Sequence, residues 1–247
     1  MPLTLNLHDK VQHQKDFYDE YWKDFRAFSS YKIQRVIWII STLLKIRSSL
    51  PSPEPKILDM GCGDGRLASF WKEVTGAELH GLDLSPRAVM NARNRYPFVN
   101  YLEGNATDSP YEDETFDLIV SQELIEHIEN QRAFIAECGR ILKRNGYLIL
   151  TTPNKYFFDR REGGNYSGQP IENIVDKAQL FSLVCPDFVV RRFETIIWAA
   201  GDYGAYRLLA NRYLLGGLGK LGLGNLWRQG LLRRGYGLNI MLLCQKR

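Results

Sequence analysis

The sequence predicts one α/β domain built on a parallel sheet with helices on both faces. From Lys56 onward, short apolar runs alternate with segments whose apolar residues recur at helical spacing, as in repeated strand-helix-strand units. The first apolar run also ends in a glycine-rich turn, as in folds that bind ligands at the carboxyl edge of a parallel sheet. With 247 residues, of which 45% are hydrophobic, the chain can bury a substantial core.

Residues 1–54 are predicted to form a helical cap ahead of this alternation. Aromatic and aliphatic residues between positions 15 and 46 recur at helical spacing and predict two amphipathic helices. Pro51, Pro53 and Pro55 then end any helix and indicate a linker. The aromatic side chains of the cap either pack on the sheet or cover a pocket at its edge.

Residues 55–198 are predicted to form the core, and each of its elements follows from its own pattern. Apolar runs predict strands at Lys56–Met60, Glu78–Asp83, Val99–Glu103, Phe116–Ser121, Tyr147–Thr152 and Asp187–Trp198. Helical spacing predicts helices at Arg66–Val74, Pro86–Arg95 and Gln131–Lys143, the last stopped by Gly146 in left-handed conformation. The polar, glycine-rich residues 154–170 predict a surface loop, and Gly237–Gln245, within residues 237–247, predicts a last strand.

Residues 199–236 separate the last two predicted strands and are expected to form a helical lid. Between Ala205 and Arg234, ten leucines interleave with six Arg or Lys residues, which favours helices that seek a surface. Five glycines between Gly216 and Gly224 would interrupt one long helix and form a hinge. The lid would cover either an apolar or lipid-linked acidic acceptor or any other small molecule.

The charge of the chain is distributed unevenly. The formal net charge is +4, yet Tyr203–Arg247 holds eight Arg or Lys residues and no Asp or Glu, so the first 202 residues carry −4. A basic C-terminal segment is compatible with an acidic substrate, an anionic membrane surface or RNA.

Several classes of protein are excluded. No apolar run approaches the length of a membrane-spanning helix, and the N-terminus does not have the pattern of a secretory signal. The four cysteines lie far apart, without the CxxC pairs of zinc or redox sites. We therefore expect a cytoplasmic protein.

The most informative motif follows the first predicted strand. Asp59 ends this strand, and Gly61, Gly63 and Gly65 alternate after it. Such glycines let the backbone approach a ligand closely, beside the positive end of the next helix. Asp83 ends the second strand twenty residues after Gly63, the spacing at which a carboxylate can accept hydrogen bonds from a ribose diol.

These residues, with Gly81-Leu82-Asp83 and Phe116 to Ser121, resemble the class I S-adenosylmethionine-dependent methyltransferases over roughly residues 55–155. The resemblance implies a Rossmann-like, doubly wound sheet of seven strands, mostly parallel, with an antiparallel C-terminal strand. It implies S-adenosylmethionine as the cofactor and S-adenosylhomocysteine as the product.

Carried over by position, the resemblance assigns the cofactor to the ends of four strands. The residues that would contact it are Asp59, Gly61, Cys62 and Gly63 for the methionine and ribose part, Asp83 and Leu84 for the ribose hydroxyls, Asn105 and Ala106 for adenine, and Gln122 through its backbone. The family usually has Asp where this chain has Asn105, which changes the group offered to the adenine amine.

A nicotinamide-dependent oxidoreductase is a remote alternative. The stretch from Gly63 to Ala68 also satisfies the loose dinucleotide-binding pattern GxGxxA. Dinucleotide loops do not generally need Asp59 and Gly61 ahead of this pattern. Binding of S-adenosylhomocysteine in preference to NADH separates the two classes.

Two residues after the fourth strand are candidates for catalysis. A helix at this point would place His127 one turn from Glu123 on the same face. His127 is then either a general base for an acceptor hydroxyl or a side chain bonded locally. Glu123, Glu126 and His127 also resemble the metal-binding Glu-x-x-Glu-His of small-RNA 3′-terminal methyltransferases, but no histidine follows His127, so no metal is expected.

The acceptor is expected to be a small molecule. The Asn/Asp-Pro-Pro-aromatic tetrad of enzymes that methylate adenine or glutamine is absent after the fourth strand, and the chain looks more like the ubiquinone-biosynthesis O-methyltransferases. This resemblance implies an enzyme that methylates a small-molecule acceptor on oxygen. The leucines and basic residues of the lid favour an acceptor that is apolar, lipid-linked or acidic, and are compatible with peripheral contact to an anionic membrane or lipid. The alternatives are an RNA-modifying methyltransferase that uses the basic segment and a cofactor-binding protein without catalysis.

Overall fold

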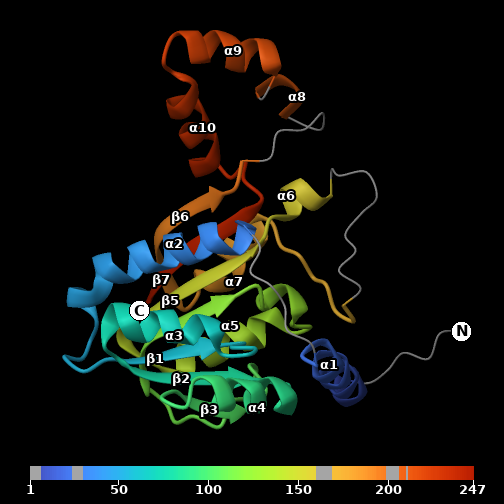
Figure 1. Ribbon diagram of the computed structural model, residues 1–247, viewed down its shortest axis with the longest axis vertical. Helices are drawn as coiled ribbons and strands as arrows, with labels where there is room; N and C mark the ends of the chain where they lie inside the picture. Colours follow the sequence, from blue (N-terminus) through green and yellow to red (C-terminus); the bar gives the residue numbers. More distant parts are fainter. Residues whose placement is uncertain (1–6, 24–29, 160–168, 199–205, 210) are drawn as a thin grey trace, which may run out of the picture.

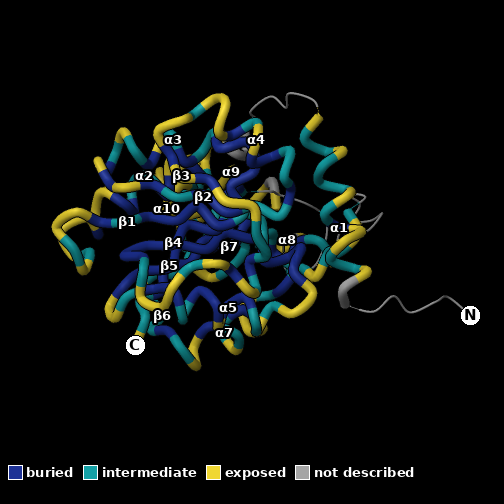
Figure 2. The backbone as a smooth tube through the Cα atoms, turned by 90° about the horizontal axis from the view of Figure 1, so that it is seen from below, coloured by how far each residue is buried: buried dark blue, intermediate teal, exposed yellow. Residues whose placement is uncertain are grey.

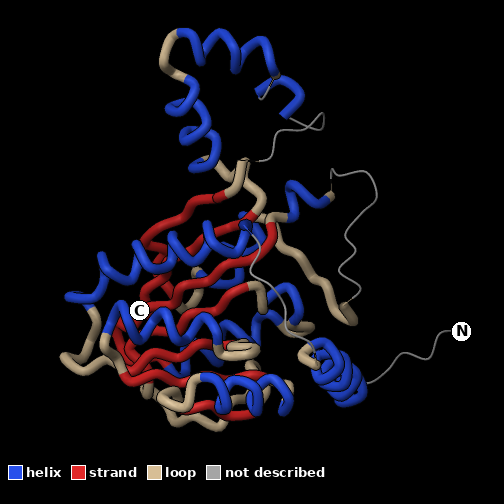
Figure 3. Tube along the Cα trace, in the orientation of Figure 1, coloured by secondary structure: helices blue, strands red, loops and turns tan. Residues whose placement is uncertain are grey.

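Seven strands form one sheet in the order β3-β2-β1-β4-β5-β7-β6 (Figures 1 and 3). The computed structural model describes residues 7–23, 30–159, 169–198, 206–209 and 211–247. Strands β1 to β5 pair in parallel, and β7 is antiparallel to both β5 and β6. The strands are β1 (Lys56–Met60), β2 (Glu78–Asp83), β3 (Asn100–Glu103), β4 (Phe116–Gln122), β5 (Leu142–Pro153), β6 (Phe188–Ile196) and β7 (Asn239–Lys246). The predicted fold class is confirmed.

Helices cover both faces of this sheet. On one face lie α2 (Ser30–Ile46), α3 (Arg66–Thr75) and α4 (Pro86–Arg95), and on the other lie α5 (Gln131–Ile141) and α7 (Lys177–Val184). Alternate strand residues point to opposite faces. Leu58 joins the buried cluster under α5 and α7, whereas its neighbour Ile57 joins the cluster under α2 to α4. Figure 2 shows the resulting buried layer of strands between more exposed helices.

The strand order reverses between β1 and β4. From β1 the chain continues outward through β2 and β3, and then returns to the other side of β1 as β4. In open α/β sheets, ligands bind where the strand order reverses in this way. The turns after β1, β2, β3 and β4 all reach this edge. Helix α1 (Leu7–Tyr21) lies at one end of the sheet, where it contacts α4 (Figure 1).

The predicted helix Gln131–Lys143 is too long at its C-terminus. The helix ends at Ile141 because Leu142 is already extended and pairs with Phe116 as the first residue of β5. The left-handed residue is Asn145, with φ +61°, rather than Gly146. A glycine is needed at position 146 for space, since a Cβ there would lie 2.8 Å from the Lys143 carbonyl oxygen.

The predicted strand Asp187–Trp198 is also too long. β6 ends at Ile196, because Ile197 has a left-handed backbone with φ +64° and cannot continue the ladder. The predicted linker contains a short 3₁₀ turn, η1 (Arg47–Ser49), and the predicted loop 154–170 begins with a short helix, α6 (Lys155–Phe158). Residues 160–168 lie outside the described part of the chain.

The described residues of the insertion between β6 and β7 form three helices, α8 (Tyr206–Leu209), α9 (Arg212–Lys220) and α10 (Gly224–Arg233). We refer to these helices as the arm. Figure 1 shows the arm projecting away from the sheet, beyond β6 and on the side opposite β3. In the described part of the chain, the arm contacts the body mainly through α10 and β6. Among the described residues, no helix is long and apolar enough to span a membrane.

Candidate active site

The turn after β1 requires glycine at three positions. The φ angle is +79° at Gly61, +54° at Gly63 and +74° at Gly65, in the region that residues with a Cβ rarely adopt. Space is limiting as well. A Cβ on Gly63 would lie 2.5 Å from the Trp22 ring, and a Cβ on Gly65 would lie 2.3 Å from the Tyr101 hydroxyl oxygen. The backbone of this turn can therefore be approached closely only because side chains are absent.

Hydrogen bonds fix the turn against β2. The N–H groups of Gly61 and Cys62 both donate to the carbonyl oxygen of Leu82, at 2.7 and 3.0 Å. The N–H of Gly63 donates to Oδ2 of Asp83 at 2.8 Å. Burial raises the pKa of the Cys62 thiol, so this side chain stays neutral and lines the turn. The ends of β1 and β2 thus form one rigid unit.

Asp83 is the carboxylate at the centre of this unit. Its Oδ1 accepts from the N–H of Ser85 at 3.0 Å, while Oδ2 is bonded to Gly63. Burial raises the pKa of Asp83, and these backbone hydrogen bonds oppose the shift. Each carboxylate oxygen can still accept a further hydrogen bond. Leu84 follows directly and leads into α4, whose first turn is capped by the Ser85 hydroxyl at 3.1 Å from the N–H of Ala88.

In the described residues, nine buried polar side-chain atoms lack a hydrogen-bond partner, and three of them lie at the carboxyl ends of β1 and β4. These three are Asp59 Oδ2, Ser121 Oγ and Gln122 Nε2. Burial raises the pKa of Asp59 to about 7, the charge of Asp83 adds to the shift, and Trp71 opposes it. Buried polar atoms normally have partners. Their absence here is the feature that fits a polar ligand such as S-adenosylmethionine at this edge.

The turn after β3 carries the predicted adenine contacts. Oδ1 of Asn105 accepts from both the N–H and the hydroxyl of Thr107, each at 3.0 Å. This side chain therefore stabilises its own turn, and its amide NH₂ group is the part that can donate to a ligand. Ala106 is buried beside it. Both residues lie at the same sheet edge as Asp83, because β2 and β3 pair in parallel through Asp83 and Glu103.

The predicted helical relation between Glu123 and His127 is wrong. Glu123 has a left-handed backbone with φ +50°, and only a 3₁₀ turn, η2 (Ile125–His127), follows it. The two side chains therefore do not share a helix face. Glu123 instead accepts hydrogen bonds through Oε2 from Arg35 at 2.8 Å and from Asn239 at 2.9 Å. It anchors the end of β4 to α2 and β7.

His127 is positioned by a contact that the sequence does not reveal. Its Nδ1 lies 3.0 Å from the carbonyl oxygen of Ile171. Since a carbonyl only accepts, Nδ1 carries the hydrogen and Nε2 keeps the lone pair. Burial lowers the pKa of His127 and raises that of Glu126 well above its usual range. Nε2 is 3.7 Å from Glu126 Oε1, too far for a hydrogen bond, so a neutral imidazole nitrogen remains able to accept a proton.

No metal centre forms from the Glu-x-x-Glu-His sequence in the part of the chain that the structure describes. Glu126 accepts from the Thr152 hydroxyl at 2.9 Å, Glu123 bonds to Arg35, and His127 turns to Ile171. Across the described ranges, no group of three or more His, Cys, Asp or Glu side chains is arranged to hold an ion.

Helix α1 covers the edge where these turns meet. Gln14 donates to the backbone carbonyl of His127, and Asp19 accepts from the Ser85 hydroxyl. At the end of the helix, the Trp22 ring fills the space over Gly63. The sequence indicated an aromatic cap, but it could not show which aromatic residue lies on the glycine turn. The packing of Trp22 against Gly63 decides this, and it joins residues that are about forty positions apart in the sequence.

The structure thus brings together most of the predicted site. Asp59, Gly61, Cys62, Gly63, Asp83, Leu84, Asn105, Ala106 and Gln122 all lie on the turns or strand ends at one sheet edge. Glu123 and His127 lie at that edge as well, but they point to different partners. Sequence reasoning missed Asn239, the first residue of β7, whose contact with Glu123 depends on the antiparallel return of the last strand.

Comparison with known proteins agrees with this geometry. Residues 58–150 match the family model described as a methyltransferase domain. A protein of Mycolicibacterium smegmatis, named a probable S-adenosylmethionine-dependent methyltransferase, is 35% identical over 102 residues, which cover 41% of this chain and 39% of that protein. The ubiquinone biosynthesis O-methyltransferase of Mesorhizobium japonicum is 33% identical over 113 residues, or 44% of this chain and 45% of that one. The chain spans less than half the length of these curated relatives.

The similarity to solved structures extends over nearly the whole chain. The geranyl diphosphate C-methyltransferase of Streptomyces coelicolor, solved with Mg²⁺, geranyl diphosphate and S-adenosylhomocysteine, has a TM-score of 0.59 at 16% identity. The alignment covers 95% of this chain and 98% of that one, which shows a shared fold. Residues 58–150 therefore form a methyltransferase domain, and in sequence this part of the chain resembles relatives named as S-adenosylmethionine-dependent methyltransferases.

Proposed function

We propose that the protein is an enzyme that transfers the methyl group of S-adenosylmethionine to oxygen of an apolar small molecule. The observation that carries this proposal is the position of Asp83, fixed by the N–H groups of Gly63 and Ser85 beside the glycine turn. A carboxylate held in this way can receive the two hydroxyl groups of a ribose. The family match supports the same chemistry.

The remaining cofactor contacts are assigned to the same edge. Asp59, Gly61, Cys62 and Gly63 would hold the methionine and ribose part, with Asp83 and Leu84 on the ribose. Asn105 and Ala106 would contact adenine, and the backbone of Gln122 would lie beside the sulfur. The unpartnered Oδ2 of Asp59 and Nε2 of Gln122 support a polar ligand between the ends of β1 and β4. Bound S-adenosylmethionine supplies a methyl group on a positively charged sulfur.

In the proposed reaction, bound S-adenosylmethionine would supply its methyl group to an acceptor oxygen held in line with it, and the electrons of the carbon–sulfur bond would stay with sulfur. S-adenosylhomocysteine is the product. The hydroxyl proton of the acceptor goes to Nε2 of His127, which is unprotonated because burial lowers the pKa of this imidazole. The protein contributes mainly alignment, by holding acceptor and methyl group in line in a pocket that excludes water.

The apolar character of the acceptor is supported by two similar proteins and by the arm. One relative acts in ubiquinone biosynthesis as an O-methyltransferase, and a structure of the same fold contains geranyl diphosphate. Both names refer to molecules with prenyl chains. The arm of this chain exposes leucines next to basic side chains, as would suit an acceptor that combines an apolar chain with a polar or anionic group.

Calorimetric titration of S-adenosylhomocysteine into the wild-type protein and two variants tests the site. Asp83→Ala removes the carboxylate, and we expect at least about a hundredfold loss of affinity from two lost charge-assisted hydrogen bonds. Gly61→Arg adds a side chain where φ is +79° and a Cβ would lie 3.0 Å from Leu124, and we expect no measurable binding.

The exposed Glu73→Ala variant on α3 is the matched control and should bind like wild type. Unchanged affinity in both site variants would reject the site assignment. Tight binding of NADH in place of S-adenosylhomocysteine would reject the proposed class of enzyme. Thermal unfolding of each variant separates a lost site from a lost fold.

A further inference from the structure

The arm exposes apolar side chains that the rest of the described chain does not cover. Leu208 is 77% exposed, Tyr213 73%, Leu221 72% and Leu226 70%. They lie on α8, on α9, at the turn between α9 and α10, and on α10. Among the described side chains of the arm, Leu231 on the inner side of α10 is the buried one, at 2% exposure. Apolar surface gathered on a protruding element marks a site of interaction.

The charged side chains of the arm are all basic. Residues 206–234 contain six Arg or Lys and no Asp or Glu. In the part of the chain that the structure describes, no carboxylate forms an ion pair with Lys220, Arg228 or Arg233, and all three residues are exposed. Unlike the paired cations of the body, such as Arg35 with Glu123, these groups are available to an external anion. The arm therefore presents leucines and cations together.

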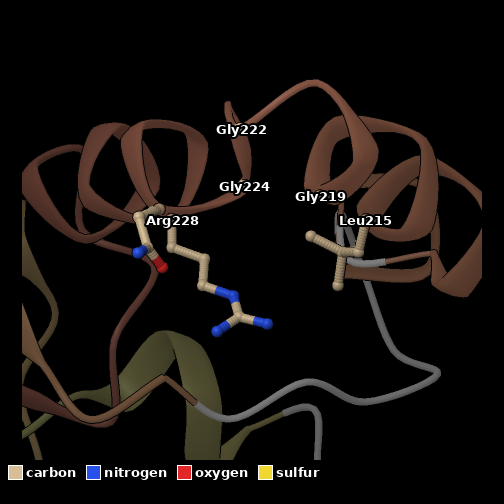
Figure 4. Close-up of a pocket in the computed structure, with 6 residues that line it drawn as sticks. Leu215, Gly219, Gly222, Gly224 and Arg228 are labelled. Carbon is tan, nitrogen blue, oxygen red and sulfur yellow. The ribbon is translucent and has the colours of Figure 1, made fainter.

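A small pocket between α9 and α10 shows where one anionic group would fit. It has a volume of about 200 Å³ and is lined by Leu215, Gly219, Gly222, Gly224, Asn225 and Arg228. Figure 4 shows the Arg228 guanidinium directed into the space between the two helices. Gly222, with φ +70°, makes the turn, and no side chain caps the N-terminus of α10. An arginine beside an uncapped helix N-terminus suits a phosphate group.

The base of the arm is fixed to the edge of the sheet that carries the candidate active site. Asn154, directly after β5, donates from Nδ2 to the carbonyl oxygens of Gly235 and Gly237, both at 2.8 Å. Asn239 begins β7 just beyond the arm and bonds to Glu123. The base of the arm is therefore fixed at the carboxyl ends of β4 and β5.

We propose that the arm docks the protein on an anionic lipid bilayer. The exposed leucines enter the interface, the cations lie against phosphate headgroups, and Arg228 binds one of these headgroups in its pocket. A combination of leucines and basic residues on short helices is typical of interfacial binding. Single-stranded RNA would need cations and aromatic platforms but would leave these leucines exposed to water. The suggestion that docking also delivers the acceptor rests on the proposed function, whereas docking itself does not.

Sedimentation of the full chain with two kinds of vesicle tests this proposal. One kind contains phosphatidylcholine alone, and the other contains one quarter phosphatidylglycerol. We expect binding to the anionic vesicles that weakens as salt is added, and little binding to the neutral ones. Lys220→Gln with Arg228→Gln should lower the partition coefficient about thirtyfold, at about 1 kcal/mol for each cation near the surface. Leu221→Ser with Leu226→Ser should lower it at least about tenfold.

Matched controls change the same residue types on the body. Lys56→Gln with Arg144→Gln removes two exposed cations, and Met90→Ser with Phe98→Ser removes two exposed apolar side chains. Both should partition like wild type. Wild-type protein that fails to bind anionic vesicles, or arm variants that bind as well as wild type, would overturn the proposal. Strong, salt-sensitive binding to RNA without vesicle binding would overturn it in favour of a nucleic acid surface.

Calorimetry with S-adenosylhomocysteine separates this proposal from the proposed function. The arm variants should keep the wild-type affinity, since no residue of the arm belongs to the assigned cofactor contacts; this also shows that they are folded. Vesicle binding by a protein that does not bind S-adenosylhomocysteine would leave the docking surface in place and reject the enzyme. Normal affinity for S-adenosylhomocysteine without vesicle binding would reject the docking surface and leave the proposed enzyme in place.

Discussion

Asp59 couples the stability of the fold to pH. The carboxyl is buried, and its pKa rises from 3.8 to about 7, so the folded chain holds this proton more tightly than the unfolded chain does. From about pH 4 to about pH 7 the unfolded carboxyl is ionised while the folded one is still protonated. The free energy of unfolding therefore falls as the pH rises through this window, by about 1.4 kcal/mol per pH unit from this group.

We predict that Asp59→Asn removes this dependence. Urea unfolding at about pH 8 should show the variant to be more stable than wild type, by up to about 4 kcal/mol, and the difference should vanish near pH 4. The exposed Asp108→Asn variant should follow wild type across the range. Parallel curves for Asp59→Asn and wild type would show that Asp59 is ionised in the folded protein.

His127 is predicted to act on turnover and not on cofactor binding. Its Nδ1 is bonded to Ile171, so the lone pair on Nε2 is the group that can take a proton from the acceptor. His127→Ala should lower kcat by about a hundredfold or more, the typical contribution of a general base, while S-adenosylhomocysteine affinity stays the same. His80→Ala, which changes the other histidine of the core, is the control. If His127→Ala turns over normally, alignment alone drives the reaction.

The parts of the site that could be predicted are those set by local sequence. Gly61, Gly63 and Asp83 were identified because a strand, a glycine turn and a carboxylate follow each other at fixed spacing. The relation of Glu123 to His127 could not be predicted, since a left-handed Glu at φ +50° has no signature in the sequence. That conformation is held by the contacts of Glu123 with Arg35 and Asn239, which come from distant parts of the chain.

At the scale of elements, helix α1 limits access to the glycine turn. The Trp22 ring occupies the space into which a ligand approaching Gly63 would enter, and Asp19 ties the helix to Ser85 and to the N–H of Arg87 at 3.2 Å. Entry of the cofactor then requires this end of the helix to move.

We predict that Trp22→Ala speeds the association of S-adenosylhomocysteine by about fivefold or more, since the ring no longer has to leave. Stopped-flow fluorescence of the remaining tryptophans measures the rate. Trp227→Phe changes a tryptophan of the arm and should leave the association rate unchanged. An unaltered rate in Trp22→Ala would show that α1 does not control entry.

The order of helices and strands could be predicted because their periodicities differ. Alternation in the strands follows from burial of both sheet faces, and helical spacing follows from burial of one helix face. The boundaries depend on pairing. Leu142 suits either a helix or a strand by its own properties, and its partner Phe116 makes it the start of β5. Likewise, the composition predicts a helical lid over residues 199–236. The structure shows that the helices of this segment form an arm that lies beyond β6.

In the whole molecule, the proposed cofactor site and the proposed docking surface lie on separate parts, the body and the arm. The body carries the proposed cofactor site at the ends of β1 to β4, and the arm, whose base is fixed at the ends of β4 and β5, presents the exposed leucines and cations. This division predicts that the two functions can be separated. Substitutions at Asp83 should abolish cofactor binding without affecting vesicle binding. Substitutions at Arg228 should weaken vesicle binding without affecting cofactor binding.

Transfer of radiolabelled methyl groups from S-adenosylmethionine tests whether the protein methylates an apolar small molecule. The protein is incubated with an extract of the organism that encodes it, and the products are separated into lipid, small-molecule, RNA and protein fractions. We predict label in the lipid or apolar small-molecule fraction, and none with Asp83→Ala. Label confined to RNA or protein would contradict the claim, as would a protein that binds S-adenosylhomocysteine but labels no fraction.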